Sequence, residues 1–148
     1  MTRLRGVLVR SGVVGSMVLA SLGWGLPHAG ASGVSLSQWV GPTSAVWSAF
    51  ETTYTSLMVA LKHGETAKAR TLFEKAGMVA VNLATDADSS STVLNNAVVV
   101  LSYDMEQWAW DGYVAIGGSA VQVATYVTMT SHLTAAATAF TKDLKKVK

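Results

Sequence analysis

Apolar side chains recur at steps of three and four residues through most of the chain after residue 43. This spacing is typical of α-helices that bury one face, and breaks divide it into four segments. The pattern predicts helices over about 44–63, 66–85, 92–113 and 119–145. Four amphipathic helices with short connections favour an all-α fold, an antiparallel up-down four-helix bundle.

Residues at the segment ends have the chemistry of helix caps. Gly64 is suited to the left-handed conformation that ends many helices. The polar run 86–92 is expected to be a loop in which Ser90 or Ser91 caps the next helix, and Ser119 follows the glycine pair 117–118 as another cap. Each predicted boundary therefore has a local physical cause.

The segment 32–43 contains Gly33, Gly41 and Pro42, and we expect it to be a non-helical lead-in. Thr43 or Ser44 would then cap the first helix. Trp39, the one large side chain of the segment, is expected to pack back against the bundle.

Residues 121–129 also alternate between apolar and polar side chains, which is the period of a β-strand, and 98–100 are three consecutive valines. A fold of helices plus a hairpin is the alternative that these segments leave open. The helical spacing continues from 126 to 144, which favours the helix.

The N-terminal segment has the order of charges and apolar residues found in secretory signal peptides. Arg3, Arg5 and Arg10 precede an uncharged stretch over 11–26, and Ala29-Gly30-Ala31 offers the small residues that a signal peptidase requires. We therefore expect a signal peptide over 1–31 that is cleaved after Ala31, leaving 32–148 as a single helical-bundle domain.

An uncleaved membrane anchor is the alternative for this segment. The apolar stretch covers about sixteen residues and is interrupted by glycines, whereas a bilayer core requires roughly twenty apolar residues. The expected location is consequently extracellular, periplasmic or in the cell envelope, with membrane contact only through the leader before cleavage.

Removal of the leader changes the charge balance. The chain has 11 Lys and Arg against 9 Asp and Glu, and the three leader arginines leave eight against nine. Nucleic-acid binding depends on many cationic contacts to phosphates, so no nucleic-acid partner is expected. The chain has no cysteine, which excludes disulfides, thiol nucleophiles and cysteine-ligated metals.

The densest group of polar and aromatic residues lies at 103–113. On a helix, Asp104, Trp108 and Asp111 fall close to one face, and a second face holds Glu106, Trp110 and Tyr113. Carboxylates beside aromatic rings suit acid–base chemistry or the stacking of a sugar, but aromatic residues at helical spacing usually fill a core. We expect packing for Trp108, solvation for the acids, and a weak candidate surface or ligand cluster made of Asp104, Glu106, Trp108, Trp110, Asp111 and Tyr113.

Metal and cofactor patterns are incomplete. The loop that starts at Asp86 has Ser91 and Ala97 where a calcium loop requires glycine and glutamate. No glutamate is followed three residues later by histidine, as a dimetal bundle site requires, and Met58 and His132 fall at different levels for a shared haem. We expect no cofactor and no metal.

The triplet Trp110-Asp111-Gly112 resembles the turn of small helical-hairpin proteins exported by dedicated bacterial secretion machines. The likeness covers this turn alone and assigns no family.

The sequence thus predicts a secreted or cell-envelope helical bundle that is not an enzyme and acts by contact with an unknown protein or small ligand. One alternative is a hydrolase that uses Asp104, Glu106 or Asp111. Another is a carrier of a small apolar ligand in the bundle core, for which the lining would be Trp47, Phe50, Tyr54, Trp108, Tyr126 and Phe140.

Overall fold

The computed structural model describes residues 35–85 and 87–146. The predicted signal peptide and its cleavage site lie outside these residues. The described chain forms four helices: α2 (Leu36–His63), α3 (Thr66–Thr85), α4 (Thr92–Ala115) and α5 (Ala120–Lys146). It contains no strand, so the all-helical prediction is confirmed and the helix-plus-hairpin alternative is wrong.

The first helix begins at Leu36 rather than near Ser44, so the prediction of a non-helical lead-in up to residue 43 is wrong. Ser35 caps α2 by accepting a hydrogen bond from the Gln38 N–H at 3.4 Å, and Pro42 lies inside the helix. Proline removes one backbone hydrogen bond from a helix interior. Here the cost is offset because Leu36, Trp39 and Thr43 continue the buried face through the proline.

Trp39 is 2% exposed, and its ring centroid lies 6.4 Å from that of Phe140 in α5. The prediction that this tryptophan packs against the bundle is confirmed.

The remaining helix caps agree with their sequence signals. Gly64 ends α2 with a positive φ of 73°, and Ser91 caps α4 by accepting a hydrogen bond from the Leu94 N–H. Ser119 and Gln122 form a reciprocal pair, in which the Ser119 N–H donates to Gln122 Oε1 at 2.7 Å and the Gln122 N–H donates to Ser119 Oγ at 3.4 Å. Such a capping box satisfies donors that the start of a helix leaves free.

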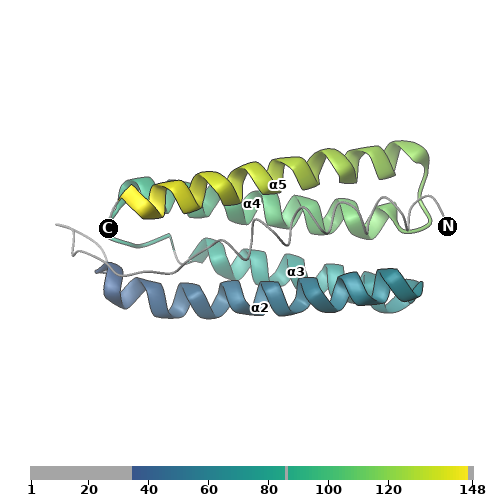
Figure 1. The fold of residues 1–148 in the computed structure, drawn as a ribbon, viewed down its shortest axis with the longest axis horizontal. Coiled ribbons are helices and arrows are strands. Elements are labelled where there is room, and N and C mark those ends of the chain that lie inside the picture. The colour runs from purple at the N-terminus through teal and green to yellow at the C-terminus, as the bar shows by residue number, and fades with distance from the viewer. Residues whose placement is uncertain (1–34, 86, 147–148) are drawn as a thin grey trace.

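The helices run lengthwise along the molecule and pack in chain order, α2 on α3, α3 on α4 and α4 on α5 (Figure 1). Within residues 35–85 and 87–146, no helix has both the length and the apolar character needed to cross a bilayer.

The core is built around the indole of Trp108, which is 1% exposed. The centroid of its ring lies 5.9 Å from the ring centroid of Phe50 and 5.7 Å from that of Tyr54, both on α2. The corresponding distances are 5.4 Å to Phe73 on α3 and 5.9 Å to Tyr126 on α5. Aromatic pairs at these separations attract each other beyond the effect of buried area. One side chain of α4 therefore contacts rings from the three other helices.

The glycine of the triplet Trp110-Asp111-Gly112 serves this packing. The triplet lies inside α4 and not at a turn, so the resemblance to an exported-hairpin turn is not borne out by its position. A Cβ atom at Gly112 would overlap the Phe73 ring, which lies against the backbone of α4 there. The absence of a side chain at Gly112 lets Phe73 reach Trp108.

Two helical glycines at the contact of α3 with α4 give a matched test. We expect Gly112→Ala to destabilise the fold by about 1–3 kcal/mol, because the new methyl group displaces Phe73 in a packed core. A Cβ atom at Gly77 would lie an ordinary 3.7 Å from Ala109 Cβ. Gly77→Ala should therefore stabilise by up to about 1 kcal/mol through helix propensity. Urea unfolding followed by circular dichroism measures both changes; equal effects would contradict the packing described for Phe73.

Candidate functional site

The residues of the candidate cluster do not share one environment. Trp108 belongs to the core, where its Nε1–H donates a hydrogen bond to Thr130 Oγ1 at 3.2 Å. Glu106 and Trp110 are exposed, and Tyr113 is half-buried. Trp108 is thus buried in the core and cannot stack on a ligand at the surface.

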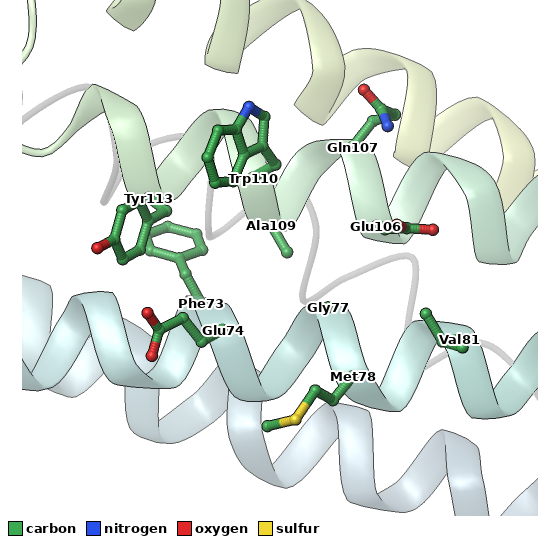
Figure 2. Close-up of a pocket in the computed structure, with 10 residues that line it drawn as sticks. All are labelled: Phe73, Glu74, Gly77, Met78, Val81, Glu106, Gln107, Ala109, Trp110 and Tyr113. Carbon is green, nitrogen blue, oxygen red and sulfur yellow. The ribbon is translucent and has the colours of Figure 1, made fainter.

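Glu106, Trp110 and Tyr113 lie together along a surface groove between α3 and α4 (Figure 2). The groove has a volume of about 550 Å3, within the range of small-molecule sites. Its full lining is Phe73, Glu74, Gly77, Met78, Val81, Glu106, Gln107, Ala109, Trp110 and Tyr113.

Large apolar side chains are exposed along this groove. Met78 is 64% exposed, Val81 is 50% exposed and Trp110 is 61% exposed. The Trp110 and Tyr113 rings are stacked, with centroids 5.9 Å apart and planes inclined by 7°. These side chains form an apolar, partly aromatic surface that water covers in the isolated molecule.

Arg70 holds one end of the aromatic pair. Its guanidinium carbon lies 5.5 Å from the centroid of the Tyr113 ring, and its Nη2 donates a hydrogen bond to the Ile116 carbonyl at 2.8 Å. The Arg70 guanidinium therefore lies over the Tyr113 ring, and its hydrogen bond to the backbone just after α4 holds it there. This contact orients Tyr113, on which Trp110 stacks.

The charged side chains that line the groove are carboxylates. Glu74 comes from α3 and Glu106 from α4, and no lysine or arginine is part of the lining. An apolar groove with negative charges at its walls suits a ligand with an apolar body and a positive charge.

Asp104 and Asp111 do not line the groove. Partial burial raises the pKa of each carboxyl group above its usual value, and for Asp104 the charge of His132 on α5 opposes the rise. The two residues lie seven positions apart along α4, which is about 10 Å of helix. The structure therefore does not bring the carboxyl groups of raised pKa into the concave site that the hydrolase alternative requires.

The sequence signals for metals and haem lead to no assembled site in the described part of the chain. No three or more of its His, Asp and Glu side chains gather as metal ligands. His132 is exposed, whereas Met58 is half-buried. Asp86, the first residue of the weak calcium pattern, lies outside the described residues.

The loop before α4 is held by its own polar groups. Asn95 Nδ2 donates a hydrogen bond to the Ser89 carbonyl, and Asn95 Oδ1 accepts one from the Ser89 N–H, each at 2.9 Å. The Asn95 side chain therefore ties the backbone of Ser89 in the loop to the helix that follows it.

The aromatic residues proposed as a carrier lining are all buried. Successive ring contacts join Trp47, Phe50, Tyr54, Trp108 and Tyr126, whereas the Phe140 ring lies against Trp39. Among the described side chains, three buried polar atoms have no hydrogen-bond partner: Thr43 Oγ1, Trp47 Nε1 and the Tyr126 hydroxyl. Burial raises the pKa of Tyr126 far above its usual value, and the nearby Tyr54 adds to the effect. The rings assigned to a carrier lining thus pack with other aromatic rings in the described structure.

The sequence pattern does not predict the α3 half of the groove. Glu74, Met78 and Val81 lie at steps of four and three on the exposed side of α3. The sequence signal for this half was the placement of Met78 and Val81 on an otherwise polar face of the helix. Only the packing of α3 on α4 brings these residues next to Glu106 and Trp110.

The raised pKa of Asp111 makes a pH-dependent prediction. The folded state holds the proton more tightly than the unfolded state, so this group favours folding below its unfolded pKa and loses that contribution as pH rises through the raised value. We expect Asp111→Asn to be more stable than the wild type at pH 7 and to match it near pH 3. Urea titrations at the two pH values measure this. The matched control is Asp88→Asn in the exposed loop; a similar gain for it at pH 7 would contradict the prediction.

Comparisons of the chain with protein-family models, with curated proteins and with solved structures find no match.

Proposed function

We propose that this protein is an exported, non-enzymatic helical bundle that acts by binding, and that the groove between α3 and α4 is its binding site. The observation that carries the proposal is the exposure of Met78, Val81 and Trp110 along one concave surface. Clustered apolar side chains on a folded surface mark sites of interaction, because leaving them in water forfeits the free energy of burying them.

The ligand class follows from the groove's chemistry. Glu74 and Glu106 supply negative charge, and the exposed ring of Trp110 attracts cations through its π electrons, as the Tyr113 ring beside it already does with Arg70. We propose that the groove takes an apolar or aromatic group that carries a positive charge, as an organic amine or the basic side chain of a peptide does.

Export and topology belong to the same proposal. The order of arginines, apolar residues and Ala29-Gly30-Ala31 supports a cleaved signal peptide. Short connections and packing of each helix on the next support an antiparallel up-down arrangement. A cysteine-free domain also needs no oxidative folding outside the cytoplasm.

The charge preference can be tested with two ligands that share one ring. Tryptamine and indole-3-propionate carry opposite charges on similar side chains, and we expect the amine to bind at least about tenfold more tightly. Binding is measured by calorimetry and by the NMR shift of the Trp110 indole N–H. The double variant Glu74→Gln/Glu106→Gln should lose about tenfold in amine affinity, since each exposed ion contact contributes up to about 1 kcal/mol.

Glu51→Gln on α2 removes a carboxylate outside the groove and should leave amine affinity unchanged. Equal affinity for amine and acid, or an equal loss in the Glu51 variant, would exclude the groove as a cation site.

The export proposal is checked by expressing the full chain and measuring the mass of the protein that leaves the cytoplasm. We expect an N-terminus at Ser32, because the small residues at 29 and 31 match the specificity of signal peptidase. A full-length product recovered with the membrane fraction would instead show an uncleaved anchor.

A further inference from the structure

An apolar stripe runs along the outer side of α4, opposite the face that carries Trp108. Val93 is 50% exposed, Val100 is 54% exposed, and Tyr103 and Trp110 are each 61% exposed. Asn96 and Gln107 occupy the two intervening positions, so the α4 stripe follows steps of three, four, three, four and three. This is the spacing of an a/d seam in a coiled coil.

The α4 stripe has the same order of apolar and polar positions whether it is followed from its N-terminal or from its C-terminal end. It runs apolar, polar, apolar, apolar, polar, apolar, with its midpoint between Leu101 and Ser102. A second α4 laid against it in the opposite direction would place Val93 against Trp110, Asn96 against Gln107, and Val100 against Tyr103. A two-fold interface uses the same patch on both partners, and such a patch must be self-complementary.

The charges of α4 favour this antiparallel direction. Residues 92–103 carry no charge, whereas Asp104, Glu106 and Asp111 make the second half acidic. Parallel helices would oppose each acid to its own copy, which is destabilising. Antiparallel helices place the acidic half of one α4 along the uncharged half of the other, with Asp111 near the positive N-terminal end of the second helix.

We propose that two copies of this chain associate along the α4 stripe as an antiparallel, two-fold dimer. The stripe spans about 25 Å of helix. A standard interface buries about 800 Å2 on each partner. This area is larger than the area that the four half-exposed apolar side chains of the α4 stripe can bury. The neighbouring exposed side chains Val99 on α4 and Met78 and Val81 on α3 extend the dimer surface toward α3.

The dimer goes beyond the proposed groove function, and its centre lies outside the groove. Val93, Val100 and Tyr103 are not part of the groove lining, although Trp110, Met78 and Val81 belong to both surfaces. The two proposals can therefore fail separately.

Cysteine crosslinking tests the direction, because the chain has no cysteine of its own. Asn96→Cys and Gln107→Cys replace the polar positions and keep the apolar ones. In an antiparallel dimer of one variant, the two identical cysteines lie about 16 Å apart along the helix axis. In a mixed dimer, the cysteine at 96 of one copy lies opposite the cysteine at 107 of the other. With a short thiol crosslinker on protein expressed from the full chain, we expect covalent dimer only from an equal mixture. Dimer from each variant alone, or from neither preparation, would overturn the proposal.

Sedimentation tests the surface independently of direction. Val100→Glu adds a charge at the centre of the α4 stripe and should weaken the dimer at least about tenfold. Val121→Glu on α5, where the native side chain is 74% exposed, is the matched control and should sediment as the wild type does. Circular dichroism checks that both variants fold. A wild-type monomer at all concentrations, or equal weakening by both variants, would overturn the proposal.

Amine titration of the Val100→Glu variant separates this dimer from the groove. We expect loss of the dimer with tryptamine binding retained, since no lining residue of the groove is changed. Loss of binding in the folded monomeric variant would show that the dimer surface and the groove are not separate and would overturn the proposal in this form.

Discussion

The contact of Trp108 with rings from three other helices is the interaction on which the bundle depends. It brings Phe50 and Tyr54 of α2, Phe73 of α3 and Tyr126 of α5 around one indole. The chain has no disulfide to stabilise it. Packing must therefore supply the stability that covalent links supply in many exported domains.

The need to seat Trp108 also shapes the surface. Phe73 reaches the indole only because Gly112 has no side chain, which draws α3 and α4 together at that level. Gly77 of α3 and Ala109 of α4 are also small where the helices meet. Larger side chains then stand on both sides of the close approach, and the groove lies between them. The candidate site is thus a consequence of core packing as well as of its own residues.

α4 carries five of the ten large apolar side chains that are exposed among the described residues, more than any other helix. Trp108 and its neighbours face the core, while the α4 stripe faces solvent. A helix that is apolar on two sides is expected at the interior of an assembly rather than at the surface of a monomer. α5 shows the contrasting solution, since threonines on its exposed side, such as Thr125, Thr128 and Thr138, donate hydrogen bonds to backbone carbonyls four residues earlier. Those hydroxyls give a polar surface with few charges.

The sequence by itself determined the helical class, the span 66–85, and the caps at Gly64, Ser91 and Ser119, because these depend on side-chain spacing and local backbone chemistry. It misplaced the start of α2, because the burial of Leu36 and Trp39 outweighs the cost of Pro42 only when the rest of the bundle is present. It grouped six residues of α4 into one cluster, although packing gives Trp108 to the core and joins Glu106 and Trp110 with Glu74 and Met78 of α3. Tertiary structure decided the site because a groove between two helices depends on how closely they approach, and that distance is set by contacts between residues far apart in the chain.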